Sequence, residues 1–74
     1  MKKNYYELQI YIRYRDYLTI CTYIGTRSNA NRKFRNFVIS HGLDHSCCLR
    51  ISAYPSIHSM LDGDHPVRIT PFYA

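Results

Sequence analysis

Residues 5–24, YYELQIYIRYRDYLTICTYI, alternate between two kinds of side chain with a period of two. Successive side chains of a β-strand point to opposite sides, so this alternation is typical of strands with one buried face. The stretch therefore predicts two neighbouring strands that share an apolar face. The apolar side chains occupy even positions: Tyr6, Leu8, Ile10, Ile12, Leu18, Ile20 and Ile24.

The opposite set of side chains is rich in tyrosine rather than charge. The chain has 8 tyrosines in 74 residues, and tyrosine is enriched in surfaces that bind other molecules. Tyrosine also has a high β-propensity, so a purely structural role is the alternative interpretation. The odd positions of the stretch are Tyr5, Glu7, Gln9, Tyr11, Arg13, Tyr17, Thr19, Cys21 and Tyr23.

The length of the connection between the two strands decides which residues share a face. A two-residue turn at residues 15–16 would place the two apolar sets on opposite faces. A three- or five-residue loop centred on Arg15 instead places Ile12 and Leu18 on one face, as burial requires. We therefore expect the longer loop.

That register makes specific predictions about the tyrosine face. Tyr11 should lie diagonal to Tyr17, and Tyr5 diagonal to Tyr23, within reach of one another's rings. Arg13 should lie directly across from Tyr17. The sequence thus predicts an outer aromatic patch with a guanidinium beside it.

After Gly25 the apolar spacing changes to that of a helix. Thr26 or Ser28 is a natural N-cap, and Gly42 is a typical C-terminal stop, so we predict a helix at about residues 28–41. This helix should cover the even face of the sheet. Its apolar stripe consists of Ala30, Phe34, Phe37, Val38 and His41.

The remaining residues predict a third strand at 46–54, a helical turn at 55–61 and a short last strand at 67–70. Pro71 confines that last strand to an edge of the sheet. The order is β-β-α-β-β, which predicts an α+β fold: a single two-layer domain over residues 1–74. One helix packs on one face of its antiparallel sheet.

The composition favours some partners and excludes others. A formal net charge of +5 and a pI of about 9.3 favour anionic partners, such as nucleic acid or an acidic protein surface. No apolar run approaches the length of a membrane span. The three cysteines, with Cys47 and Cys48 adjacent, form no disulfide framework, so we expect reduced thiols in a cytoplasmic protein.

Four cations crowd the start of the predicted helix: Arg27, Arg32, Lys33 and Arg35. The positive end of a helix dipole disfavours cations, whereas free backbone N–H groups and basic side chains together make an anion site. The cluster therefore predicts contact with phosphate or with an acidic partner. A solvated polar helix face is the alternative.

Metal and catalytic chemistry find little support. A cluster at residues 41–48 contains His41, Asp44, His45, Cys47 and Cys48, but no Cys-x-x-Cys spacing occurs. Residues 62–64 read Asp-Gly-Asp, which is first of all a turn. We predict no catalytic residues, no metal site and no cofactor, and therefore a protein that is not an enzyme.

In size and style the chain resembles small stand-alone proteins of bacteriophages and other mobile elements. That resemblance implies stoichiometric binding to a host protein or nucleoprotein complex with an acidic surface, as a modulator or inhibitor. The alternative is a basic nucleic-acid-binding protein that uses the same surfaces. An edge strand offers a route to oligomers, and no membrane partner is expected. The predicted partner-binding residues are Tyr5, Tyr11, Arg13, Tyr17, Tyr23, Arg27, Arg32, Lys33 and Arg35.

Overall fold

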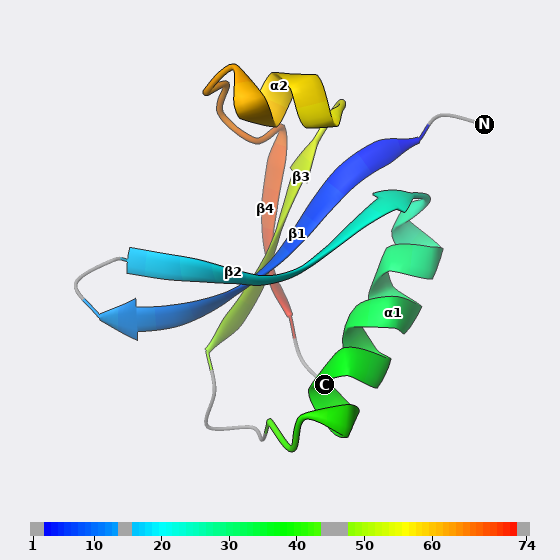
Figure 1. The fold of residues 1–74 in the computed structure, drawn as a ribbon, viewed down its shortest axis with the longest axis vertical. Coiled ribbons are helices and arrows are strands. Elements are labelled where there is room, and N and C mark those ends of the chain that lie inside the picture. The colour runs from blue at the N-terminus through cyan, green and yellow to red at the C-terminus, as the bar shows by residue number, and fades with distance from the viewer. Residues whose placement is uncertain (1–2, 14–15, 44–47, 73–74) are drawn as a thin grey trace.

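The computed structural model describes residues 3–13, 16–43 and 48–72. Its four strands form one antiparallel sheet in the order β2-β1-β3-β4 (Figure 1), which confirms the predicted α+β class. The elements in chain order are β1 (Asn4–Arg13), β2 (Asp16–Gly25), α1 (Arg27–Ser40), β3 (Leu49–Tyr54), α2 (Ile57–Leu61) and β4 (Arg68–Phe72).

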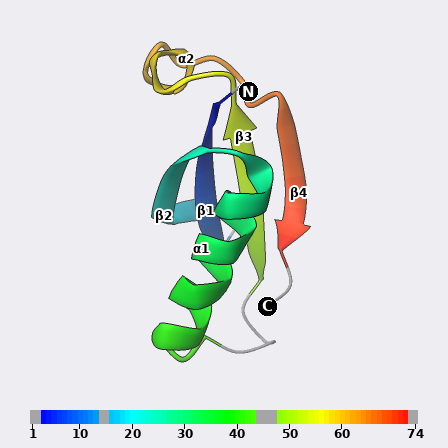
Figure 2. The ribbon, with the colours of Figure 1, turned by 90° about the vertical axis from the view of Figure 1, so that its right-hand side faces the viewer.

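The main helix, α1, covers one face of the sheet, as Figure 2 shows, and the core lies between the two. Phe34 and Leu8 are fully buried there, and Ile10, Ile20 and Phe37 pack around them half-buried. The predicted helix stripe and the even face of β1 are thus confirmed as the core, except that His41 and Ile12 are exposed. The buried members are Tyr6, Leu8, Ala30, Phe34, Val38, Leu49, Ile51, Ala53 and Phe72.

Both ends of α1 follow local sequence signals. Thr26 is the N-cap, and its Oγ1 accepts a hydrogen bond from the Asn29 backbone N–H at 3.4 Å. At the other end Gly42 has a φ of 66°, and Leu43 N–H donates to the Val38 carbonyl at 3.1 Å. This Schellman-type ending requires the left-handed conformation that glycine adopts without strain.

The register between β1 and β2 differs from the prediction because the hairpin has two irregularities. Arg13 pairs with Asp16, and Tyr11 pairs directly with Tyr17, so Ile12 is an extra residue in β1. A second irregularity makes Ile20 an extra residue in β2. Each β-bulge shifts the alternation by one residue, so the faces exchange along β2. Arg15, on which the predicted loop was centred, lies outside the described residues.

The second bulge overturns the predicted face of half of β2. Leu8 pairs with Cys21 and Tyr6 with Tyr23, and both β2 residues pack against the core. Tyr5 instead lies on the opposite side of the sheet. The predicted diagonal contact of Tyr5 and Tyr23 is therefore wrong, because the two rings are on different faces.

The junction of β2 with α1 depends on a glycine. A Cβ atom on Gly25 would lie only 2.7 Å from Cε2 of Tyr23, so the tyrosine ring closes over the space that glycine leaves. Lys33 of α1 lies 5.6 Å from the centroid of the same ring. Tyr23 therefore helps to join sheet and helix.

The second half of the sheet agrees with the sequence pattern. Leu49, Ile51 and Ala53 of β3 face the core as predicted, while residues 46 and 47 lie outside the described ranges. β4 is an edge strand that contains Pro71 and extends to the buried Phe72. The predicted helical turn is α2, which lies beyond the end of β3 at the top of Figure 1.

The packing of the core predicts that alanine substitutions of Phe34 and Phe37 lower the free energy of unfolding by different amounts. Phe34→Ala should lower the free energy of unfolding by about 3–5 kcal/mol, because it leaves a fully enclosed cavity. Phe37 is half-buried and stacks on His41 with ring centroids 4.1 Å apart, so Phe37→Ala should cost clearly less. Urea denaturation of both variants checks this, and equal losses would contradict the position of α1 on the sheet.

Candidate functional site

The sheet face opposite α1, called here the outer face, has Gln9 at its centre. Gln9 Oε1 accepts hydrogen bonds from Arg50 Nε at 2.8 Å and from Ser52 Oγ at 2.9 Å. Its Nε2 donates to Thr19 Oγ1 at 3.2 Å and to Glu7 Oε1 at 3.4 Å. One side chain therefore connects β1, β2 and β3, and satisfies the buried Ser52 hydroxyl.

At the end of the outer face that carries Tyr5, the side chains of β1 are buried. Tyr5 is 5% exposed, and its hydroxyl donates to Glu7 Oε2 at 3.0 Å. Burial, together with the Glu7 carboxylate, raises the pKa of Tyr5 to about 12. Burial and the same carboxylate also raise the pKa of Tyr54, whose ring centroid lies 5.9 Å from that of Tyr5. Tyr5 is thus part of the interior and offers no ring to a partner.

The adjoining ends of β1 and β2 are open and apolar on both sides of the sheet. Figure 1 shows the connected ends of β1 and β2 projecting to the left, away from α1. Tyr11 is 43% exposed and lies on the outer face beside the half-buried Tyr17. Leu18 pairs with Ile10, so its side chain, 54% exposed, lies on the α1 side of the sheet, and Ile12 at the bulge is 58% exposed. We call Tyr11, Ile12, Tyr17 and Leu18 the hairpin end.

Contacts with neighbouring side chains hold the aromatic pair of the hairpin end in place. The rings of Tyr11 and Tyr17 meet edge to face, with centroids 5.6 Å apart. The guanidinium of Arg50 lies 3.5 Å from the centroid of the Tyr17 ring, and Gln9 holds that guanidinium through Nε. The Tyr17 ring therefore packs on a guanidinium that is itself fixed by a hydrogen bond to Gln9.

The four cations of α1 do not act as one cluster. Arg27 and Arg35 lie on one side of the helix, where they line a groove beside β4. Lys33 lies on the other side and donates through Nζ to the Thr22 carbonyl of β2 at 3.0 Å. Arg32 is exposed and lines neither feature.

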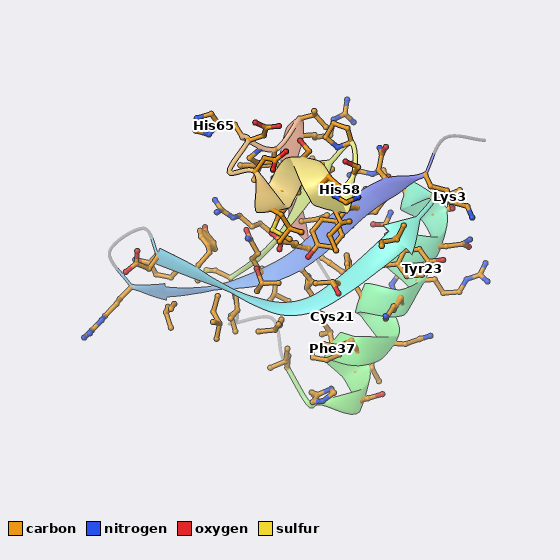
Figure 3. The ribbon with its side chains drawn as sticks, turned by 45° about the horizontal axis from the view of Figure 1, so that its top comes forward. Lys3, Cys21, Tyr23, Phe37, His58 and His65 are labelled. Carbon is orange, nitrogen blue, oxygen red and sulfur yellow. The ribbon has the colours of Figure 1, made fainter. Side chains whose placement is uncertain are left out.

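The structure therefore divides the predicted tyrosine site. Tyr11, Tyr17 and the exposed Arg13 come together at the hairpin end, but Arg13 pairs with Asp16 rather than with Tyr17. Tyr5 is buried on the outer face, and Tyr23 contributes to the core. Figure 3 labels Tyr23 on the part of β2 that lies beside α1.

Sequence reasoning missed the residues that complete the hairpin end. Ile12 and Leu18 were assigned to the core, and Arg50 was not considered as a partner of Tyr17. A polar glutamine in the middle of an otherwise buried strand was the signal for the network. Its partners could not be named without the pairing of β1 with β3.

The described residues contain no group of three or more His, Cys, Asp or Glu side chains that could hold a metal ion. Asp44, His45 and Cys47, which belonged to the considered cluster, lie outside the described ranges. His58 and His65 do not converge, since they point apart on either side of α2 (Figure 3). Asp64 accepts a hydrogen bond from Ser59 Oγ at 2.9 Å, as a turn residue does.

Comparison of the chain with protein-family models found no match, and comparison with curated proteins and with solved structures found none either. In the part of the chain that the structure describes, neither helix is long and apolar enough to cross a membrane.

The Tyr5 hydroxyl predicts a specific loss of stability at alkaline pH. Its pKa is raised above the ordinary value of 10.0, so the folded state favours the neutral phenol. The resulting stabilisation is complete below pH 10 and is lost as the pH rises toward about 12. Tyr5→Phe should show a weaker fall in unfolding free energy over this interval, measured by urea denaturation at several pH values.

Tyr11→Phe is the matched control, because the Tyr11 ring is exposed. This control should retain the alkaline fall of the wild type. An identical pH profile for Tyr5→Phe and the wild type would contradict the burial of the Tyr5 hydroxyl.

Proposed function

We propose that this protein is a small non-enzymatic binding protein whose hairpin end contacts a host protein or a host nucleoprotein complex. The observation that supports the proposal is the exposure of Ile12, Leu18 and Tyr11 on one projecting hairpin, where Tyr11 packs against the half-buried Tyr17. It would act by stoichiometric binding in the cytoplasm, as a modulator or inhibitor of the bacteriophage type.

The apolar character of the hairpin end favours a protein partner. Ile12 and Leu18 are each more than half exposed. A partner that buries these apolar side chains removes them from water, which stabilises the complex. Tyrosine is among the residues that dominate interface energies, because it buries a large rigid ring and keeps a polar hydroxyl at its edge.

The contacts of Arg50 and Gln9 next to Tyr17 would also strengthen binding. Arg50 and Gln9 restrict the orientation of Tyr17 before a partner arrives. A side chain that is already ordered loses less conformational entropy on association, so more of the contact energy appears as affinity.

Direct nucleic-acid binding is the second candidate, since exposed tyrosines beside arginines can stack on unpaired bases. Two observations make it the weaker one. One face of the Tyr17 ring is already occupied by the Arg50 guanidinium, and the Tyr11 and Tyr17 rings meet edge to face rather than side by side. The aliphatic neighbours Ile12 and Leu18 contribute nothing to base stacking.

The hairpin end predicts a large loss of binding without a loss of fold. Tyr11→Ser combined with Tyr17→Ser should weaken partner binding by more than tenfold, because a buried aromatic anchor contributes about 2 kcal/mol or more. The measurement is a pull-down from lysate of the source organism, treated with nuclease and quantified by mass spectrometry. The specific partner is a protein that the wild type retains and this variant does not.

Leu61→Ser combined with Val67→Ser is the matched control. Both residues are exposed, at 69% and 64%, and belong to the α2–β4 region. The control should retain the partner, and the binding should persist at high salt. Recovery that disappears after nuclease treatment and falls steeply with salt would instead support the nucleic-acid candidate.

A further inference from the structure

A second surface lies apart from the hairpin end, in a groove between α1 and β4. The groove has a volume of about 160 Å³. Arg27, Asn31 and Arg35 follow one another at four-residue spacing along one side of α1 and form its polar wall. Its remaining lining residues are Ile51, Pro71 and Phe72.

The groove concentrates positive charge that no described residue of its lining balances. Among the described residues that line it none is acidic, and α1 itself, RSNANRKFRNFVIS, contains no acid. Arg27 occupies the first turn, where the helix dipole makes a cation unfavourable. Arg27 is held toward β4 by a hydrogen bond from Nη2 to Thr70 Oγ1 at 3.2 Å. A guanidinium kept at this end of a helix is complementary to an anion.

The spacing of the two arginines selects the form of the anion. Eight residues of helix separate Arg27 from Arg35, which corresponds to about 12 Å along α1. In an extended peptide, side chains four residues apart point to the same side and lie about 13 Å apart. Two carboxylates at that spacing can therefore meet one guanidinium each, and the Asn31 amide lies between them for the peptide backbone.

A nucleic-acid backbone fits the groove less well. A phosphate chain needs a continuous series of cations, whereas the other two cations of this helix region do not line the groove. Lys33 is bound to the Thr22 carbonyl on the opposite side of α1, and Arg32 is directed elsewhere. The apolar residues Pro71 and Phe72 suit the aliphatic part of a peptide side chain.

We propose that the α1–β4 groove binds an extended acidic segment of a protein, with acidic side chains four residues apart held by Arg27 and Arg35. The guanidinium groups each offer a pair of N–H donors to a carboxylate. This site is separate from the hairpin end, and binding at the groove does not require the hairpin end to be occupied.

The test is an NMR titration of the ¹⁵N-labelled full chain with a capped pentapeptide, acetyl-EAAAE-amide. The expected result is a saturable shift of the backbone amides around Arg27, Asn31, Arg35 and Thr70. The neutral analogue acetyl-QAAAQ-amide should cause no such shift. The absence of a saturable shift with the acidic peptide would overturn the proposal.

Charge-matched variants separate a specific site from general attraction to a basic protein. Arg27→Gln with Arg35→Gln should lower the affinity for the peptide by about tenfold or more, since it removes two charge-assisted pairs. Lys3→Gln with Arg32→Gln removes the same charge outside the groove and should change the affinity by less than about threefold. Equal losses in the two double variants would overturn the proposal.

Two further arms complete the design. Arg35→Gln alone leaves the Arg27–Thr70 hydrogen bond in place, and it should still weaken the peptide if the double variant fails to fold. A single-stranded oligothymidine that binds more tightly than the peptide, and loses binding in Arg35→Gln, would identify a phosphate chain as the occupant and overturn the protein-segment assignment. Tyr11→Ser with Tyr17→Ser should leave peptide binding unchanged, which keeps this result distinct from that of the hairpin end.

Discussion

The first half of strand β1 is buried on both of its faces, and the rest of the structure follows from that constraint. The four consecutive residues Tyr5, Tyr6, Glu7 and Leu8 are all buried. Even positions enter the apolar core beneath α1. Odd positions include a carboxylate and an amide, which must be hydrogen-bonded once they leave water. The network around Gln9 meets this need by joining β1 to both of its neighbouring strands.

The two-sided burial separates the tyrosines into different roles. Tyr5 completes the polar network, Tyr6 enters the core, and Tyr23 packs over Gly25 at the start of α1. Tyr11 and Tyr17 lie past Ile10, the last residue of β1 in the β3 ladder. Tyr11 is exposed and Tyr17 half-buried, because no strand or helix of the described residues lies over them, whereas the Arg50 side chain reaches the Tyr17 ring. The sequence suggests one uniform tyrosine face, but in the structure the outer face is buried at Tyr5 and exposed at Tyr11.

The periodicity of the sequence was sufficient to predict the element order, the helix with its caps, and strand β3. It failed in β2 because a single extra residue, Ile20, reverses the alternation after it. Apolar residues on both sides of that bulge leave no break in the pattern. The sequence therefore predicted Ile24 in the core and Tyr23 on the outer face, which is the reverse of the structure. The four cations of α1 could be predicted as a group from their place in the helix. Their division between two sides, and the position of Arg50 over Tyr17, depend on tertiary pairing.

Our central proposal is that the hairpin end contacts a partner protein. The most direct measurement is site-specific photocrosslinking in cells of the source organism, with benzoylphenylalanine placed at Tyr11 in one variant and at Leu61 in another. The account predicts a discrete protein adduct from position 11 and none from position 61, because only the first lies on the proposed contact surface. Adducts of equal yield from both positions, or an adduct from position 61 alone, would contradict it.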